Sequence, residues 1–247
     1  SVKIDPETRR IDRANTYAVM NPYCESALET ALRLKDQHGA EVIVITMGPP
    51  KAEAILRKAL SCGADRAVLV SDPAFGGSDT LATSYILSLA LKKMMPFDLL
   101  LFGRQAIDGD TGQVGPETAQ LLELPILTLV RNIEPQEAGF RIDRLSDAGA
   151  ERWNIQSPCA LTVIKEDNEL REPRFELRMP AKRAEIPRFG KAELNPDPGK
   201  IGLNGSPTQV VAFHAPEFSN ERELLKGSVP EMVSALIDRL EKRGALT

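Results

Sequence analysis

The residue types best suited to binding chemistry in this chain are glycines, acids and one arginine that follow an apolar run near its middle. Residues 99–102 are Leu-Leu-Leu-Phe, Gly103 and Arg104 follow directly, and the loop continues with further glycines and two aspartates to Val114. The pattern predicts a strand, a glycine-rich turn and a helix. Backbone without a Cβ can approach a ligand closely, and a helix N-terminus offers unpaired N–H groups to a phosphate. We therefore predict that residues 103–114 form one wall of a nucleotide site.

The same loop carries charges that complicate phosphate binding. Asp108 and Asp110 would repel a phosphate. Arg104, the backbone N–H groups or the hydroxyl of Thr111 would then have to outweigh them, unless the acids face ribose hydroxyls instead. A glycine-rich turn that binds nothing accounts for the pattern about equally well, because no fixed phosphate-binding motif is matched. The spacing leaves these alternatives open.

Composition and missing motifs exclude several classes of function. The net charge is −4 at pH 7, so the chain has no general basic field for nucleic acid. No apolar run approaches the ~18 residues of a membrane span, and no secretory signal is present. Three cysteines without CxxC spacing suit a reducing compartment, and two distant histidines disfavour a metal site or a histidine-based triad. The absence of GxGxxG, GxxxxGK(S/T), HExxH and GxSxG motifs disfavours an enzyme with its own conventional active site.

The spacing of apolar residues in the first half of the chain predicts alternating strands and helices. Nearly all-apolar runs at 41–47, 67–70 and 98–102 are typical of strands that are covered on both faces. Helical spacing is found before and between these runs, at 25–38, 52–60 and 79–91. Such alternation implies βαβ crossovers. We therefore expect an α/β fold with a mainly parallel sheet, helices on both faces and a Rossmann-like, adenine-nucleotide-binding architecture.

The second half of the chain departs from this alternation. Residues 126–164 contain short, partly alternating runs that predict a β-meander followed by one buried strand. Residues 165–188 are highly charged and carry three prolines. Because proline interrupts both helices and sheets, we expect an exposed loop without regular structure there.

A linker and an arm are predicted at the C-terminal end. Residues 190–207 are rich in Gly, Pro, Asn and Lys, as expected for a linker. A capping box at Ser228 opens a helix whose apolar residues follow helical spacing to Leu240. We therefore predict an α/β domain at 1–189, and a linker and C-terminal arm ending in a helix at 190–247. From the pattern alone, the apolar side of this helix more often packs on its own domain, and contact with a partner is the alternative.

Four segments away from the glycine-rich loop carry further recognisable residues. Residues 21–24 are Asn-Pro-Tyr-Cys, residues 44–50 end a strand in Thr-Met-Gly-Pro-Pro, and residues 63–66 are Gly-Ala-Asp-Arg. Residues 172–175, in the charged segment, are Glu-Pro-Arg-Phe. Together with residues 103–116, these segments resemble the β subunit of electron transfer flavoproteins over nearly the whole chain.

This resemblance implies a heterodimer in which the C-terminal arm wraps an α subunit. Since Met47 and Gly103 end strands predicted to be neighbours, their loops are expected to open on the same edge. The positions that match the family's nucleotide-binding residues are Asn21, Pro22, Tyr23, Cys24, Met47, Gly48, Asp79, Thr80, Gly103, Arg104, Gln105, Ala106, Ile107, Asp108, Gly109, Asp110, Thr111, Gly112, Gln113 and Val114. The positions that match its partner-recognition segment, at about 166–188, are Arg174, Phe175, Leu177 and Lys182.

Two nucleotides are compatible with the resemblance. Conventional members of the family hold AMP as a structural group in this subunit, whereas electron-bifurcating members hold a second FAD there. Residues 108–116 and 75–80 resemble the bifurcating type. The small Gly109 and Gly112 would also leave space for a flavin beyond the adenosine. We therefore favour FAD, with AMP as the alternative.

The bifurcating type implies a path for electrons. NADH would reduce the flavin of this subunit, and electrons would pass to the α subunit and to a low-potential acceptor, ferredoxin or flavodoxin. An acyl-CoA dehydrogenase or reductase would be the other partner, in a bacterial cytoplasm. Arg104 is expected to adjust the charge around the flavin, unless it pairs with Asp108 or Asp110. The alternatives are a conventional carrier with AMP that links acyl-CoA dehydrogenases to the quinone pool, and a stand-alone adenylate-binding regulatory protein.

The sequence departs from the family pattern at two places. Relatives begin with a strand of the type Val-x-Val-Lys-x-Val-Pro-Asp-Thr just before the point where this chain begins, so we expect the sheet and the nucleotide site to lack that part. Between Phe175 and Met179 the recognition loop is about three residues shorter than in conventional members. Leu177 is the nearest candidate for the family's protruding leucine. The difference implies a dedicated dehydrogenase or reductase partner, or a different docking mode.

Overall fold

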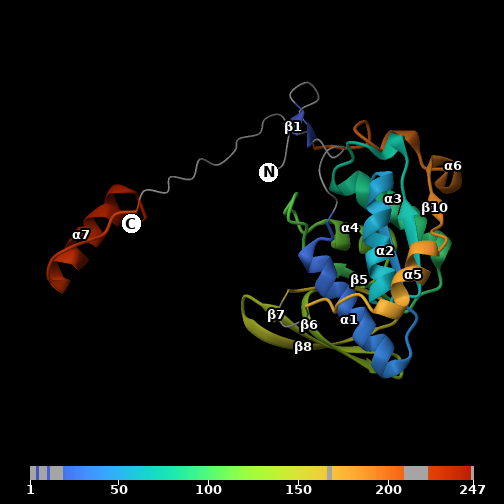
Figure 1. Ribbon diagram of the computed structural model, residues 1–247, viewed down its shortest axis with the longest axis horizontal. Helices are drawn as coiled ribbons and strands as arrows, with labels where there is room; N and C mark the ends of the chain where they lie inside the picture. Colours follow the sequence, from blue (N-terminus) through green and yellow to red (C-terminus); the bar gives the residue numbers. More distant parts are fainter. Residues whose placement is uncertain (1–3, 6–9, 12–18, 166–168, 209–221, 246–247) are drawn as a thin grey trace. The chain divides into compact units, whose positions relative to one another are not determined.

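Strands and helices alternate in the first half of the chain, as its apolar spacing predicts. The computed structural model describes residues 4–5, 10–11, 19–165, 169–208 and 222–245. The chain divides into two compact units, residues 1–211 and residues 212–247. Figure 1 shows both units, coloured along the sequence. Near the start of the chain, β1 (Ile4–Asp5) and β2 (Arg10–Ile11) form a short antiparallel pair.

A three-stranded parallel sheet forms one part of the large unit. β3 (Ile43–Met47) pairs with β4 (Arg66–Val70), and β10 (Arg188–Phe189) joins the other edge of β4. Successive side chains of a strand point to opposite faces. Leu69 accordingly packs in the core cluster of α2, whereas Val70 packs in that of α3. Helices thus cover both faces of this sheet, which explains why β4 is apolar almost throughout.

A five-stranded sheet forms the other part, and it is mixed. Its order is β5-β9-β6-β7-β8. β9 runs parallel to β5 and β6, whereas β7 runs antiparallel to β6 and β8. The meander prediction is confirmed, but the prediction of a mainly parallel sheet is wrong, because two-residue connections can join only antiparallel strands. The strands are β5 (Leu99–Gly103), β6 (Ile126–Gln136), β7 (Gly139–Ser146), β8 (Gly149–Gln156) and β9 (Cys159–Val163).

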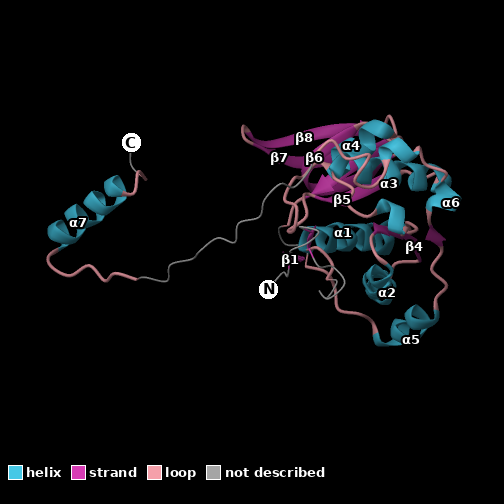
Figure 2. Cartoon of the chain, turned by 90° about the horizontal axis from the view of Figure 1, so that it is seen from above, coloured by secondary structure: helices cyan, strands magenta, loops and turns pink. Residues whose placement is uncertain are grey.

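β3 and β5 are not neighbours in a sheet, contrary to the prediction. Among the described strands, β3 pairs with β4 alone and β5 with β9 alone. A hollow of about 840 Å³ lies between their first residues, lined by Ile43 and Leu99 among others. α1 (Pro22–His38) links the two sheets instead, since Leu32 packs with the cluster of α2 and Leu34 with the five-stranded sheet. Figure 2 shows α1 between β5 and α2.

The helices of the large unit begin and end at residues that suit helix termini. Asn21 precedes α1 and Pro22 is its first residue, so the helix begins before the predicted Glu25. Proline is favoured there because its fixed φ suits a helix and its missing N–H is not needed. Gly39, at φ 73°, ends α1. The other helices are η1 (Pro50–Ala52), α2 (Glu53–Cys62), η2 (Pro73–Phe75), α3 (Thr80–Met94) and α4 (Val114–Leu121).

A helix lies where the charged segment is predicted to have no regular structure. α5 (Phe175–Arg183) contains Pro180, and Ala181 is its buried residue. Figure 2 shows α5 on the outer side of α2, away from β4. The prediction is wrong because Pro173 and Pro187 lie outside the helix and only Pro180 removes a donor from it. α2 supplies a packing surface that the sequence of the segment does not reveal.

Residues 190–206 belong to the large unit, although their composition predicts a linker. α6 (Lys191–Leu194) and η3 (Pro198–Lys200) follow β10 directly. Leu194 and Ile201 are buried in the core cluster of α3, and the buried Ser206 hydroxyl donates to Gly202 O at 2.7 Å. The division at 211/212 therefore lies beyond the predicted boundary at 189/190.

The small unit contains the helix that is predicted at the C-terminal end. α7 (Val229–Lys242) begins with a capping box between Ser228 and Glu231, as predicted. Val233, Leu236 and Ile237 are exposed along one side of it. Within the described ranges, no helix is long and apolar enough to cross a membrane.

Candidate nucleotide site

The N-terminus of α1 and the end of β5 touch at Gly103. A Cβ on Gly103 would lie 2.6 Å from the backbone N of Cys24 and 2.6 Å from the carbonyl carbon of Tyr23. Backbone atoms cannot accommodate a Cβ that close, so only glycine fits at this position. The contact brings together two of the predicted segments, residues 21–24 and the glycine-rich loop.

Asn21 ties the glycine-rich loop to α1. Its Nδ2 donates to Gln105 O at 2.7 Å, and its Oδ1 accepts from the N–H of Ile107 at 3.3 Å. Asparagine before a helix usually accepts from the first free N–H groups of that helix, but the Asn21 side chain makes no such bond. The first turn of α1 therefore keeps N–H donors that its N-cap residue does not satisfy.

The loop then enters α4, whose N-terminus is uncapped in the same way. The side chain of Gln113, the residue before α4, makes no cap hydrogen bond. Asp110 has φ 55° and Gly112 has φ 64°, and the N–H of Asp110 donates to Ala106 O at 2.8 Å. These conformations reverse the chain tightly, so the N-termini of α1 and α4 both adjoin residues 104–113.

The two acids of the loop take hydrogen bonds from the loop itself. Asp110 accepts from Gln105 Nε2, and Asp108 Oδ1 accepts from the N–H of Gly109 at 2.9 Å. Arg104 forms an ion pair with neither acid in the described part of the chain. Its exposed guanidinium is therefore not held by the partners that one alternative interpretation assigns to it.

Side chains of α3 adjoin the start of α4. Thr80 Oγ1 lies 3.2 Å from Gln113 Oε1 and 3.2 Å from Glu117 Oε1. Ser84 Oγ donates to Glu117 Oε2 at 3.1 Å. Thr80 is thus brought to the glycine-rich loop, as the family resemblance implies.

Asp79 differs from the other predicted ligands because the protein already uses its carboxylate. It accepts from the N–H of Ala82 at 3.0 Å, and from the N–H and hydroxyl of Thr208 at 3.0 and 2.7 Å. Burial alone would raise the pKa of Asp79, but these hydrogen bonds hold it below its ordinary value. Asp79 is therefore ionised, and its carboxylate caps α3 and holds Thr208.

Met47 and Gly48 make their contacts at the end of the other sheet. Met47 packs against the cluster that contains Val70 and Phe75, and the N–H of Gly48 donates to Val70 O at 3.0 Å. Among the described residues, no hydrogen bond joins Met47 or Gly48 to the glycine-rich loop. The loop, the segment 21–24 and Thr80 are the predicted residues that direct contacts bring together.

This region contains groups that attract an anion as well as two carboxylates, of Asp108 and Asp110, that repel one. A helix N-terminus carries roughly half a positive charge, and its free N–H groups are donors to phosphate oxygens. The N-termini of α1 and α4 both adjoin the loop, and Arg104 adds a full charge. A Cβ on Gly109 would meet nothing within 4 Å, so the loop is open at that point. Among the described side chains, no cluster of His, Cys, Asp or Glu could hold a metal ion.

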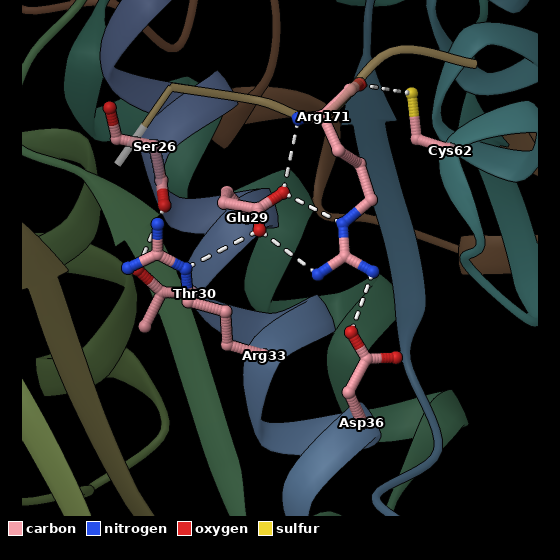
Figure 3. A network of polar contacts seen from close by, with 7 residues as sticks. All are labelled: Ser26, Glu29, Thr30, Arg33, Asp36, Cys62 and Arg171. Atoms are coloured by element: carbon pink, nitrogen blue, oxygen red, sulfur yellow. Dashed lines mark hydrogen bonds and ion pairs between the residues drawn. The ribbon is translucent and has the colours of Figure 1, made fainter. Parts of the chain in front are cut away.

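A second polar cluster, which the sequence analysis missed, holds the predicted partner-recognition segment. Arg171 Nε and Nη2 donate to Glu29 Oε2 and Oε1, both at 2.9 Å, and Nη1 donates to Asp36 at 2.7 Å (Figure 3). Burial alone would raise the pKa of Glu29, but the hydrogen bonds and charge of Arg171 hold it below its ordinary value. The sequence does offer one indication of this pair: Glu29 lies beside Leu28 and near Leu32 on the apolar side of α1, where a buried carboxylate needs a basic partner.

Comparison of the sequence with known proteins places the chain in one family. The family model described as "Electron transfer flavoprotein domain" matches residues 8–194. Subunit CarD of the caffeyl-CoA reductase-Etf complex of Acetobacterium woodii is 42% identical over 244 residues, which are 98% of this chain and 93% of the relative. Electron transfer flavoprotein subunit beta of Thermoanaerobacterium thermosaccharolyticum is 40% identical over 243 residues, which are 98% of this chain and 93% of the relative. Protein FixA of Azotobacter vinelandii is 43% identical over 228 residues, with coverages of 90% and 81%.

The chain belongs to the electron transfer flavoprotein family. Its similarity to named β subunits of this family extends over almost its full length. The predicted resemblance to the β subunit is therefore confirmed. Proteins of the family are flavin-associated electron carriers, and their β subunits partner with an α subunit.

Proposed function

We propose that this chain binds FAD at the glycine-rich loop and, with an α subunit, passes electrons from NADH to two acceptors. The acceptors are a low-potential carrier, ferredoxin or flavodoxin, and an acyl-CoA dehydrogenase or reductase. The setting is the cytoplasm of a bacterium. In this proposal residues 1–189 hold the nucleotide, and residues 190–247 provide the contact with the α subunit.

The observation that supports nucleotide binding most directly is the pair of uncapped helices at one loop. The side chain of Asn21 leaves α1 uncapped and instead fixes residues 105 and 107. Capping a helix contributes about 1 kcal/mol, so its omission costs stability unless another group takes the free donors. A diphosphate placed between α1 and α4 would accept from both helix ends.

FAD, when bound, supplies the redox chemistry, since its flavin takes a hydride from NADH and gives single electrons to acceptors. The protein contributes binding and electrostatics. Arg104 is exposed and directly follows β5, at the start of the glycine-rich loop. In our proposal it stabilises negative charge on the cofactor, while Thr80 and Asn21 keep the loop against α3 and α1.

The C-terminal helix supports the assignment of an α-subunit partner. Val233, Leu236 and Ile237 are 50%, 47% and 43% exposed on α7. An amphipathic helix of this kind is stabilised when its apolar side packs against another surface. We propose that the α subunit provides that surface.

Cofactor extraction from the co-expressed αβ heterodimer tests the proposal. We expect two flavins per heterodimer and rapid loss of visible flavin absorbance on addition of NADH. One flavin and one AMP per heterodimer, with no reaction with NADH, would establish a conventional carrier instead. A colourless monomer with stoichiometric AMP or ATP would contradict electron transfer altogether.

A further inference from the structure

The last described residues of the large unit are bonded to the loop that precedes α3. Ser206 is 7% exposed, and its hydroxyl accepts from the N–H of Asp79 at 2.8 Å and donates to Gly202 O at 2.7 Å. The N–H of Gly202 in turn donates to Ser78 Oγ at 3.1 Å. Residues 202–208, which we call the root segment, are therefore fixed against the loop before α3.

Asp79 holds the final residue of the root segment with the same carboxylate that caps α3. Its Oδ1 accepts from the N–H of Ala82 at 3.0 Å, and its Oδ2 accepts from the N–H and the hydroxyl of Thr208 at 3.0 and 2.7 Å. Hydrogen bonds to an ionised acceptor are stronger than neutral ones. The large unit ends shortly after Thr208, at residue 211. The chain therefore continues into the small unit from a point that is bonded to the start of α3.

The residue after Asp79 reaches the glycine-rich loop. Thr80 Oγ1 lies 3.2 Å from Gln113 Oε1, just before α4, and 3.2 Å from Glu117 Oε1 in the first turn of α4. A hydroxyl carries one hydrogen, so Thr80 donates to one of these oxygens at a time. Ser84, about one turn further along α3, donates to Glu117 Oε2 at 3.1 Å. The starts of α3 and α4 are therefore joined beside the N–H groups to which the proposed function assigns a diphosphate.

A continuous path of hydrogen bonds and backbone thus connects the root segment with the proposed nucleotide site. It runs from Thr208 to the carboxylate of Asp79, and from there to Thr80 at the start of α4. Fixing these side chains costs conformational entropy. A ligand that orders the path at one end lowers the entropy cost of binding at the other end. Each ligand then strengthens the binding of the other by the same factor, because coupling between two sites is reciprocal.

We propose that Asp79 is a positioning residue that couples nucleotide binding at the glycine-rich loop to binding of the α subunit by the small unit. The inference rests on the proposed function, in which the α subunit covers α7. A nucleotide at the N-terminus of α4 fixes Thr80 and Asp79, and thereby also Thr208 and the start of the connection to the small unit. The α subunit therefore binds the nucleotide-loaded chain more tightly than the nucleotide-free chain.

The test compares two affinities of the full chain for the flavin-loaded α subunit. Calorimetry measures them without nucleotide and with a saturating excess of free FAD. For the wild type we expect a complex that is about tenfold tighter with FAD. Thr208→Val removes the hydroxyl that donates to Asp79 and keeps the shape of the side chain, so the ratio should fall to about threefold. Thr208→Ser restores the hydroxyl and should restore the wild-type ratio.

Asp79→Asn interrupts the path and leaves α3 capped. Asparagine is as good an N-cap residue as aspartate, but its Nδ2 cannot accept from the N–H of Thr208, so the ratio should fall to about one. Asp72→Asn is the matched control. Asp72 also caps a helix and holds a distant segment, because its Oδ1 accepts from the N–H of Ala74 and its Oδ2 from the N–H of Lys191, both at 2.9 Å. This control should keep the wild-type ratio.

A merely structural role of these contacts gives a different result. It would weaken the complex with the α subunit by the same factor with and without FAD, and the ratio would keep its wild-type value. A weaker FAD site does not change the ratio by itself, because FAD is saturating. A wild-type ratio of about one, or a wild-type ratio that persists in both Thr208→Val and Asp79→Asn, overturns the inference. For a chain that binds FAD only in the heterodimer, the rate of FAD release replaces the ratio and must rise in Thr208→Val but not in Thr208→Ser.

The outcomes separate this inference from the function on which it rests. A flavin-containing heterodimer without coupling overturns the role of Asp79 and leaves the proposed function standing. AMP in place of the second FAD overturns the proposed electron path alone. The coupling is then measured with AMP, because the path ends at the loop that binds the nucleotide. A heterodimer in which this chain holds no nucleotide overturns both.

Discussion

Two side chains, one just before α1 and one within it, each hold a distant segment of the chain, and they do so in opposite ways. Asn21 holds residues 105–107 with neutral hydrogen bonds and leaves the first N–H groups of its own helix uncapped. Glu29, about two turns further along the helix, holds Arg171 with a carboxylate that is 5% exposed. Each oxygen of Glu29 accepts two hydrogen bonds from Arg171 or Arg33.

The region around Asn21 keeps free hydrogen-bond donors that a ligand could take. In the region around Glu29, the protein itself satisfies the buried carboxylate. Buried polar groups are stable only when all their hydrogen-bonding positions are used, as they are at Glu29. Free donors at helix ends cost stability until a ligand takes them, as we propose for α1 and α4. Substitutions at Glu29 should therefore change folding, whereas substitutions at Asn21 should change nucleotide binding.

The largest effect on stability is expected when the ion pair of Glu29 and Arg171 loses one of its two residues. Glu29→Ala leaves Arg171 without its principal carboxylate, and we expect the free energy of unfolding to fall by about 3 kcal/mol. Urea denaturation of the chain measures the change. Replacement of both residues, Glu29→Met with Arg171→Met, should recover most of the loss because no uncompensated buried charge is left: Asp36 and Arg33, which also lose a partner, are each 48% exposed. A loss below about 1 kcal/mol for Glu29→Ala would contradict the buried role of this pair.

The second-largest loss of stability is expected at Gly103, where the start of α1 touches the end of β5. In Gly103→Ala the new Cβ would lie 2.6 Å from backbone atoms of Tyr23 and Cys24. We expect a loss of about 2 kcal/mol in stability and a reduced nucleotide content of the purified heterodimer. Gly109→Ala is the matched control, because its Cβ would meet nothing within 4 Å. Equal effects of both substitutions on stability would show that the contact at Gly103 does not constrain the fold.

A smaller effect is expected from substitutions at Asn21, whose side chain bonds the glycine-rich loop and does not cap α1. Asn21→Ser can cap α1 but cannot reach Gln105, so stability should stay within about 0.5 kcal/mol while affinity for the nucleotide falls roughly tenfold. Rebinding of FAD to the heterodimer after removal of its nucleotide measures the affinity. Asn21→Ala should lose affinity and, in addition, about 1 kcal/mol of stability. Wild-type affinity in both variants would refute the role of Asn21 in the site.

The smallest effect is a pH dependence of stability at Glu29, whose carboxylate titrates, whereas the amide of Asn21 does not. The pKa of Glu29 lies below its ordinary value of 4.5, so the unfolded chain binds this proton more tightly than the folded protein does. The stabilisation is therefore present above about pH 4.5 and is lost as pH falls through the lowered pKa. Glu29→Gln should show a shallower loss of stability below pH 4.5 than the wild type. Identical slopes in acid denaturation would contradict this assignment.

Particular residues show how far sequence patterns reach. The apolar run of β4 predicted its strand correctly because a strand covered on both faces needs apolar side chains on both. The prolines at 173, 180 and 187 suggested a loop, but the contacts of Arg57 and Ala181 with α2 and α5 make a helix stable there. Leu194 and Ile201 lie in a segment with linker composition and are nevertheless core residues. Isolated apolar residues carry no periodicity, so their burial is not evident before the fold is known.

The sequence by itself determined the strand and helix periodicity of the first half, the glycine-rich loop and the family resemblance. These features depend on neighbouring residues or on residues of one segment, so local spacing is enough to reveal them. Only the tertiary structure decided that the Asn21 side chain leaves its helix for the loop, and that Glu29 meets Arg171 across 142 positions of sequence. It also decided that Phe175 and Met179, rather than Leu177, face outward. The physical reason is that such pairings arise from packing between distant segments, which no local pattern encodes.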